Sequence, residues 1–377
     1  MSEDTASSGE SKMLTAILLL PNESHRQSRH LAGVPFLLRN ALTLQKVGIK
    51  NLRIWMQDPT ERERGNLNTL MQDSRIELEI EWTDRPPSTQ ALVLDGSTLL
   101  EKSKILQAMT LSTDDQADIS RFHYFPEVLQ QLSESQKSDL LKIVPPDDSS
   151  RLTHEDDFLI AEKNLLKSVG LSNDSMMDKL ATRFISRQLT RLFLKTPITP
   201  NQITFLSLLI GLGAAWCFFQ GTYTSGLAGA IMLLVSAWVD CTDGEIARLK
   251  FMETPWGARF DIFCDNIVHF FVFFSIGMGL FFSTGDPLYK LYGGLAVYGS
   301  LVSFVILGGI IIKKKNEAGQ GKTSENSLTD QVANRDFIYF LLFMAIIDKL
   351  DIFILVTAIG ANIFALYLMY QKWGRAK

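Results

Sequence analysis

The feature that most constrains the fold is a series of long apolar stretches confined to the second half of the chain. They lie at residues 203–220, 225–245, 258–283, 288–312, 335–349 and 352–371. A helix needs about 20 residues to cross a bilayer, and all the stretches except the fifth are close to or above that length. A polar corner, Asp348 to Asp351, separates the fifth stretch from the sixth. The sequence therefore predicts six membrane-spanning helices.

Charged residues are unevenly distributed along the 377 residues. The first 200 residues contain 52 Asp, Glu, Lys and Arg residues, and the last 177 contain 26. We therefore expect a soluble first half and a lipid-embedded second half. The net charge of −4 gives no reason to expect a nucleic-acid partner. Cys217, Cys241 and Cys264 all lie in the apolar half without paired spacing, so neither a disulfide scaffold nor a zinc site is expected.

The first half shows alternating strand-like and helix-like patterns after a polar start. Residues 1–12 predict a disordered leader that is not a signal peptide. Within residues 13–150, strands are expected at 14–20, 51–56, 76–82 and 91–96, and a helix at 35–49. This alternation predicts an α/β sandwich of the Rossmann type. The Pro- and Ser-containing residues 145–150 predict a linker at its end.

Residues 151–200 are interpreted as the linker continuing into an interfacial helix. Arg183, Arg187 and Arg191 are spaced by four, so they share one helix face. An Arg-rich amphipathic helix directly before a membrane span suits the headgroup layer. An ordinary solvated charge stripe is the alternative interpretation.

Basic clusters predict the orientation of the membrane domain, residues 201–377. They lie in residues 183–195, 313–315 and 372–377. With six spans, all three clusters fall on the same side as the soluble half. The sequence therefore predicts a multi-pass protein with both termini and the polar site on the cytosolic side, in the plasma or inner membrane if the source is prokaryotic.

Four carboxylates lie at the predicted cytosolic ends of the second and third stretches. Asp240 and Asp243 are three residues apart and Asp261 and Asp265 four apart, so each pair lies on one helix face. Carboxylates at membrane depth are costly unless they are compensated. Oxygen ligands without His or Cys favour Mg²⁺, Mn²⁺ or Ca²⁺. Two such ions would neutralise a diphosphate and stabilise the attacking and leaving oxygens of a phosphoryl transfer.

Small and basic residues accompany these carboxylates. Gly244 and Gly257 have no side chain and Ala247 has a small one, so a bulky ligand can approach the backbone. Arg248 can donate two hydrogen bonds to phosphate oxygens. Asp265 could accept a proton from an alcohol nucleophile.

The complete pattern, D-x2-D-G-x2-A-R-x8-G-x3-D-x3-D, resembles the signature of the CDP-alcohol phosphotransferase family at all of its eight fixed positions. The resemblance covers residues 155–377, and it includes the TPNQIT segment at 199–204 and the RDF segment at 335–337. Members of that family have six spans, are usually dimers, and transfer a substituted phosphate from a CDP-alcohol to a second alcohol with release of CMP.

The resemblance implies a role for each residue of the pattern. Metal ions, two of Mg²⁺ or Mn²⁺, would be held by Asp240, Asp243 and Asp261, with Asp265 as a partial ligand and the catalytic base. The CDP moiety would be bound by Gly244, Ala247, Arg248 and Gly257, of which Arg248 contacts the diphosphate.

The stretch at 33–49, GVPFLLRNALTLQKVGI, resembles the opening of sugar-phosphate nucleotidyltransferases. Those enzymes use a Gly-rich loop and a Lys after the first strand, whereas residues 21–30 contain neither. Asp95 could match their metal-binding Asp, although an Asp before Gly is also common in turns. The basic residues of the loop could bind an anion or be simply solvated; they are His25, Arg26, Arg29 and His30. We therefore interpret residues 13–150 as a degenerate, inactive nucleotidyltransferase-like domain kept for assembly or regulation, similar to that of bifunctional inositol-phosphate cytidylyltransferase/CDP-alcohol transferase fusions.

The expected function is a metal-dependent phosphatidyltransferase of phospholipid biosynthesis that acts on CDP-diacylglycerol and a polyol or polyol phosphate. Basic residues near the cytosolic face could bind an acceptor phosphate, although the orientation rule alone also explains them; they are Arg191, Arg259, Lys313 and Arg335. Membrane lipids and a second copy of the chain are the expected partners. One alternative is CDP-inositol as donor, with an inositol phosphate or lipid acceptor. Two others are a non-catalytic transporter or scaffold and an active soluble domain with a membrane anchor.

Overall fold

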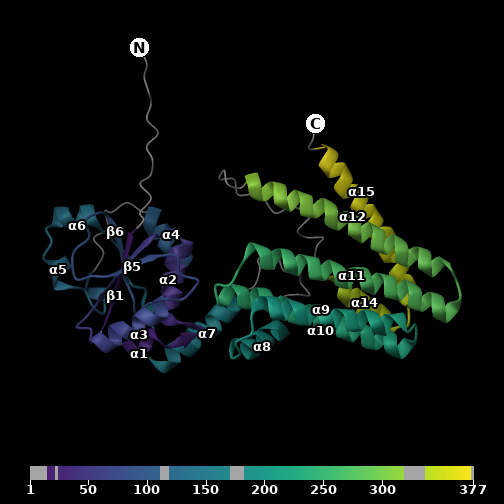
Figure 1. Ribbon diagram of the computed structural model, residues 1–377, viewed down its shortest axis with the longest axis horizontal. Helices are drawn as coiled ribbons and strands as arrows, with labels where there is room; N and C mark the ends of the chain where they lie inside the picture. Colours follow the sequence, from purple (N-terminus) through teal and green to yellow (C-terminus); the bar gives the residue numbers. More distant parts are fainter. Residues whose placement is uncertain (1–14, 22–23, 111–118, 170–181, 318–335, 375–377) are drawn as a thin grey trace, which may run out of the picture. The chain divides into compact units, whose positions relative to one another are not determined.

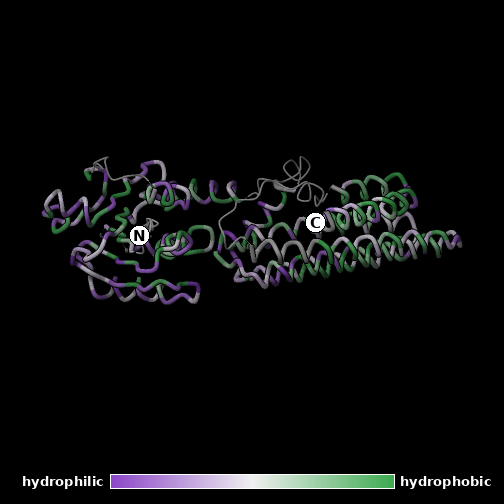
Figure 2. The backbone as a smooth tube through the Cα atoms, turned by 90° about the horizontal axis from the view of Figure 1, so that it is seen from above, coloured by the Kyte–Doolittle hydropathy of each residue, from purple (hydrophilic) through white to green (hydrophobic). Residues whose placement is uncertain are grey.

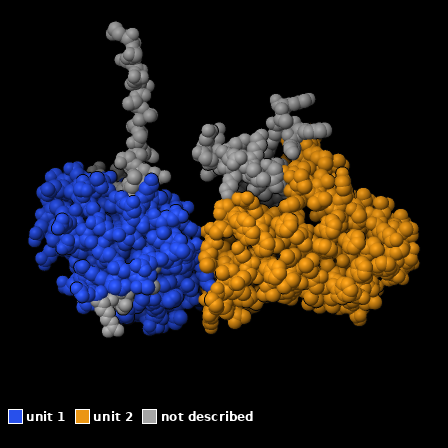
Figure 3. Space-filling model, in the orientation of Figure 1, with its two compact units in different colours: residues 1–168, 249–251 blue, residues 169–248, 252–377 orange. Residues whose placement is uncertain are grey.

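A computed structural model describes residues 15–21, 24–110, 119–169, 182–317 and 336–374. The predicted leader at 1–12 lies outside the described residues. The chain divides into two compact units, which are coloured separately in Figure 3. Unit 1 comprises residues 1–168 and 249–251, and unit 2 comprises residues 169–248 and 252–377.

Unit 1 is built on a parallel sheet of five strands (Figure 1). The strands are β1 (Thr15–Leu20), β4 (Asn51–Met56), β5 (Glu79–Trp82), β6 (Ala91–Asp95) and β7 (Leu141–Ile143), in the order β5-β4-β1-β6-β7. The chain begins in the centre, runs outward to one edge and then outward to the other, as in the doubly wound Rossmann fold. The predicted α/β sandwich is confirmed. The sequence missed β7 because its three residues are too few for a periodic signal.

Helices cover both faces of this sheet. They are α1 (Ser24–Gln27), α2 (Phe36–Lys46), α3 (Glu61–Met71), α4 (Lys102–Thr110), α5 (Glu127–Gln130), α6 (Glu134–Leu140) and α7 (Glu155–Ser168). A short hairpin, β2 (His30–Leu31) and β3 (Val34–Pro35), precedes α2. Along β1, Leu18 and Leu20 join the core with α2, whereas Ile17 and Leu19 join a second core with Leu129 of α5. Burial on both faces explains the uninterrupted apolar run of this strand.

Helix α7 belongs to unit 1, so this unit extends beyond the boundary at residue 150 that the sequence suggests. The ring of Phe158 packs edge-to-face on Phe36, with centroids 5.7 Å apart. The guanidinium of Arg29 lies 4.5 Å above Phe158 and pairs with Glu155. The predicted linker at 145–150 is part of the same unit.

Residues 249–251 are held by two arginines of unit 1. Buried Arg39 donates a hydrogen bond from Nη2 to the carbonyl of Leu249 at 2.7 Å, and Arg75 donates to the carbonyl of Lys250 at 2.5 Å. Burial lowers the pKa of Arg39 to about 10, so its guanidinium stays charged at neutral pH. Buried guanidinium groups need such acceptors, because an unsatisfied charged donor is costly.

Unit 2 consists of one amphipathic helix followed by helices that are mostly hydrophobic along their length (Figure 2). They are α8 (Arg183–Leu194), α9 (Pro200–Phe219), α10 (Tyr223–Leu249), α11 (Pro255–Thr284), α12 (Leu288–Glu317), α14 (Asp336–Ile346) and α15 (Leu350–Gly374). Within the described part of the chain, five helices are long and apolar enough to cross a membrane: α9, α10, α11, α12 and α15. Each predicted stretch overlaps a helix, but α14 has only 11 residues, so the count of six spans stays a prediction.

Glycines bring α11 into backbone contact with its neighbours. A Cβ atom on Gly277 would lie 2.8 Å from the Cα of Gly293 in α12. A Cβ on Gly279 would collide with the carbonyl oxygen of Phe218 in α9. Small residues allow close helix packing where the surroundings are as apolar as the helices. Helix α11 is therefore packed tightly between α9 and α12.

Candidate functional site

The start of α11 is fixed by a side-chain cap. The Thr254 hydroxyl accepts a hydrogen bond from the backbone N–H of Gly257 at 2.9 Å, and Pro255 occupies the first helical turn. Both are strong helix-start signals. With this start, Asp261 and Asp265 lie on successive turns of one helix face.

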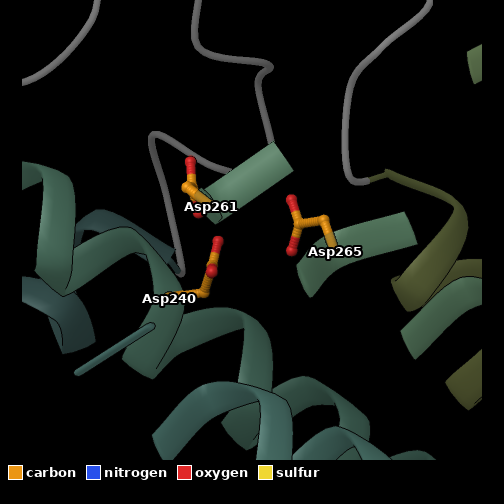
Figure 4. Close-up of side chains that lie close together, drawn as sticks. All are labelled: Asp240, Asp261 and Asp265. Atoms are coloured by element: carbon orange, nitrogen blue, oxygen red, sulfur yellow. The ribbon is translucent and has the colours of Figure 1, made fainter. Parts of the chain in front are cut away.

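Three of the four predicted carboxylates converge (Figure 4). Asp240 of α10 and Asp261 and Asp265 of α11 each place an oxygen within 4.8 Å of the other two. Two like charges at such a separation repel by roughly 3 kcal/mol at an effective dielectric constant of 20. A divalent cation among them would convert this repulsion into attraction, and carboxylate oxygens are the ligands that Mg²⁺ and Mn²⁺ prefer. The donor set therefore fits a hard divalent cation.

The fourth carboxylate, Asp243, lies outside this group of three. It is buried, and Thr204 of α9 donates a hydrogen bond to its Oδ2. Ser207, one turn later in α9, donates to Oδ1 of Asp240 at 3.4 Å. Hydrogen bonds from hydroxyl groups fix the orientation of carboxylate ligands, so α9 orients both aspartates of α10. This role of Thr204 and Ser207 is not evident from the sequence, although their spacing of three residues places them on one helix face.

A cavity of about 90 Å³ adjoins the carboxylates. Its lining includes Asp240, Asp265, Ser207, His269 and Phe337, from α9, α10, α11 and α14. The His269 ring meets the Phe337 ring edge-on, with centroids 5.0 Å apart. His269 is not among the predicted site residues, although its position four residues after Asp265 predicts the same helix face. The cavity offers polar space next to the carboxylates.

The small residues of the pattern have local structural reasons. A Cβ on Gly244 would lie 3.3 Å from Nη1 of Arg248, so the missing side chain leaves room for the guanidinium. A Cβ on Gly257 would lie 2.9 Å from Oγ1 of Thr254, which is the cap of α11. Ala247 is partly exposed one position before Arg248. The predicted CDP contacts of these residues stay predictions.

The predicted acceptor residues are exposed where their side chains are described. Arg191 lies on α8, and Arg259 lies near the start of α11, where its Nε donates to the carbonyl of Pro255 at 3.2 Å. The side chain of Lys313 and the whole of Arg335 lie outside the described residues. Their role at an acceptor phosphate stays a prediction.

The candidate site of unit 1 is built differently. Asp95, at the end of β6, is 2% exposed. Its carboxylate accepts hydrogen bonds from the Ser97 amide at 2.8 Å and from the Ser97 hydroxyl at 2.6 Å. It also forms an ion pair with Arg151 at 3.6 Å. Arg29, from the basic cluster, pairs with Glu155. Among the described residues, Asp95 belongs to no group of three possible metal ligands. These contacts fit a structural role.

A family model described as CDP-alcohol phosphatidyltransferase matches residues 197–374. The chain is also similar to a protein named bifunctional IPC transferase and DIPP synthase from Aquifex aeolicus, with 26% identity over 222 residues, which cover 56% of this chain and 47% of that protein. The chain thus spans about half of that relative. Phosphatidylinositol phosphate synthase of Corynebacterium glutamicum is 27% identical over 147 residues, which cover 39% of this chain and 64% of the relative.

A crystal structure of phosphatidylinositol phosphate synthase from Mycobacterium tuberculosis, with CDP-DAG bound, is similar to part of the chain. The alignment covers 52% of this chain and 94% of that one, with 20% sequence identity and a TM-score of 0.39.

Proposed function

We propose, from the match of the CDP-alcohol phosphatidyltransferase family model to residues 197–374, that the chain is a membrane transferase of phospholipid biosynthesis. It moves a substituted phosphate from a CDP-alcohol to a polyol or polyol phosphate and releases CMP. The observation that carries the proposal is the convergence of Asp240, Asp261 and Asp265 within 4.8 Å. The proposed donor is CDP-diacylglycerol, and the name of the Corynebacterium relative supports a polyol phosphate as acceptor.

The proposed metal ligands are the four carboxylates of the pattern, Asp240, Asp243, Asp261 and Asp265. Two bound Mg²⁺ or Mn²⁺ ions would supply charge neutralisation for the diphosphate and the leaving oxygen. Thr204 and Ser207 hold two of these carboxylates in place.

In the proposed reaction, Asp265 accepts the proton of the acceptor hydroxyl. The acceptor oxygen forms a bond to the phosphorus that carries the alcohol substituent. The bond from that phosphorus to the bridging oxygen of CMP breaks, and CMP leaves with the electron pair. Arg248, whose guanidinium lies beside Gly244, would donate to the phosphate oxygens of the departing nucleotide.

We also propose that the carboxylate end of the helices faces the cytosol, as do both termini, and that the enzyme is a homodimer. The basic residues at 183–195, 313–315 and 372–377 support this orientation. Unit 1 is proposed to be catalytically inactive, since Asp95 is used in structural contacts and residues 21–30 lack Gly and Lys.

The test is CMP release by the purified full chain with Mg²⁺ and CDP-diacylglycerol. Glycerol 3-phosphate, inositol, inositol 1-phosphate and serine are offered in turn. Asp265→Asn should abolish acceptor-dependent CMP release. The matched control is Asp286→Asn, because Asp286 lies in the turn between α11 and α12 and outside the carboxylate group.

A second candidate uses CDP-inositol as the donor. It is favoured by the name of the Aquifex relative, which joins an IPC transferase to a DIPP synthase. CMP formed only from CDP-inositol would select this candidate. Absence of CMP with both donors would contradict an enzyme and favour a transporter or scaffold.

A further inference from the structure

A buried carboxylate of α10 lies beside the metal-binding turn without belonging to it. Glu245 is 2% exposed and follows Asp243 by two residues. Two residues along an α-helix rotate the side chain by about 200°, so Glu245 faces away from Asp243. It is also absent from the group of carboxylates that converge. A buried carboxylate on this side of the helix needs its own donors.

Helix α8 supplies those donors. The Ser186 hydroxyl donates to Oε1 of Glu245 at 2.8 Å, and the Thr190 hydroxyl donates to Oε2 at 2.6 Å. Both donors are fully buried, at 0% exposure. Each carboxylate oxygen thus accepts a charge-assisted hydrogen bond from a different turn of α8. The pair of bonds fixes both the distance and the rotation of α8 relative to α10.

These two residues belong to a stripe of hydroxyl side chains along one face of α8. Thr182 precedes Ser186 by four residues, as Ser186 precedes Thr190. The Thr182 hydroxyl is 2.6 Å from the Tyr339 hydroxyl of α14. The hydroxyl stripe, defined as Thr182, Ser186 and Thr190, therefore binds α8 to both α10 and α14.

The metal-binding turn of α10 is consequently held from two sides. From α9, Thr204 and Ser207 donate to Asp243 and Asp240. From α8, Ser186 and Thr190 of the hydroxyl stripe hold Glu245 on the opposite side of α10. Asp240 must stay within 4.8 Å of the α11 carboxylates to share a cation with them, and a small rotation of α10 changes that separation. Both attachments restrain such a rotation.

We infer that Glu245 is a positioning residue, which acts through its bonds to Ser186 and Thr190 to hold the α10 carboxylates at the spacing that a divalent cation requires. The inference rests on the proposed metal site. Whether or not α8 also lies at the lipid surface as predicted, its contacts with Glu245 make it a structural part of the proposed metal centre.

The test measures Mn²⁺ affinity directly, by electron paramagnetic resonance of free Mn²⁺ titrated into the full chain in phosphatidylcholine nanodiscs. The double variant Ser186→Ala/Thr190→Val leaves Glu245 without both donors and should weaken Mn²⁺ binding at least fivefold. Glu245→Gln has only one side-chain oxygen to accept the bonds from Ser186 and Thr190, so it should also weaken Mn²⁺ binding at least fivefold. Thr190→Ser keeps the donor and should bind Mn²⁺ as the wild type does. The matched control is Glu253→Gln, in the exposed segment before α11.

Activity provides the second measurement. In the variants the concentration of Mn²⁺ needed for half-maximal activity should rise, and kcat at saturating Mn²⁺ should recover most of its value. A role in stability alone would change the folded fraction and leave the Mn²⁺ affinity of the folded protein unchanged, which would overturn the inference. Absence of Mn²⁺ binding by the wild type would instead overturn the proposed metal site and the inference with it.

Discussion

Asp95 in unit 1 and the converging carboxylates in unit 2 show two different ways to bury the same side chain. Asp95 is surrounded by donors of its own unit: the Ser97 amide and hydroxyl and the guanidinium of Arg151. Asp240, Asp261 and Asp265 instead turn toward one another. A carboxylate that donors of its own unit neutralise fits a structural role, whereas carboxylates that converge would be stabilised by a cation from solution. This difference is the basis for proposing an inactive site in unit 1 and a metal-dependent one in unit 2.

The largest difference should appear when one carboxylate of each region is changed to its amide. Asp261→Asn should lower CMP release by at least ~100-fold, because it removes charge where the transferred phosphate is stabilised. Asp95→Asn should leave the rate per folded molecule within about twofold, since the contacts of Asp95 are structural. Steady-state CMP assays at saturating Mg²⁺ measure both. A comparable loss of activity in Asp95→Asn would contradict the proposed division of roles.

The second prediction concerns addition of metal. Mn²⁺ at a free concentration of 100 times its dissociation constant should stabilise the folded state of unit 2 by about 2.7 kcal/mol, because the cation binds only the folded arrangement. Unit 1 should gain nothing. Hydrogen exchange can follow peptides from α11 and from β6 in the same sample. Equal protection of both peptides by Mn²⁺ would indicate a cation site in unit 1 as well, and chelation by EDTA should reverse the effect.

The third prediction removes the neutralised carboxylate. Asp95→Ala should destabilise unit 1 by about 2 kcal/mol, because buried donors lose their acceptor and Arg151 loses its buried partner. Faster exchange in the β6 peptide would report this loss. The control is Asp148→Ala, an exposed residue of the same region that also pairs with Arg151. A β6 peptide that exchanges as in the wild type would show that Asp95 is not needed for the fold.

The smallest effect is expected at an exposed ion pair of unit 1, because an exposed carboxylate contributes less to stability than the buried carboxylates do. The Lys104 ammonium and the Ser149 hydroxyl and amide hold the pKa of Asp147 below its ordinary value. The ionised form therefore stabilises the folded state at neutral pH, and this contribution is lost as the pH falls below about 4. Both side chains are well exposed, so Asp147→Asn should cost less than about 1 kcal/mol at pH 7.

Denaturation of the wild type and the Asp147→Asn variant at pH 7 and pH 3 checks this prediction. The difference between the two proteins should shrink at pH 3. A constant difference at both values would show that the carboxylate charge contributes nothing.

The parts of the structure that repeat along the sequence could be predicted, and the parts that depend on a partner element could not. Periodicity was sufficient for β1 and for the long apolar helices, and spacing placed Asp261 and Asp265 on one face. The hydroxyl stripe of α8 escaped notice because Ser and Thr carry no hydrophobic or charge signal. Its meaning depends on Glu245, which lies 55 residues from Thr190. Only the packing of α8 on α10 connects them.

The same limit applies to the boundary of unit 1. From the sequence, residues 151–200 are interpreted as a linker that continues into an interfacial helix, yet Phe158 of α7 packs on Phe36 in the core of the unit. The three-residue β7 was missed because a short edge strand is defined by its pairing with β6.

The tight packing of α11 at one end also controls where its carboxylates lie at the other end. Gly279, whose contact with the carbonyl of Phe218 leaves no room for a methyl group, lies 14 residues from Asp265, a distance of about 21 Å along the helix axis. A tilt of only 5° about that contact would displace the carboxylate by about 2 Å, a large fraction of the 4.8 Å within which the converging oxygens lie. The close helix contact at Gly279 thus limits how far the carboxylates at the other end of α11 can move apart.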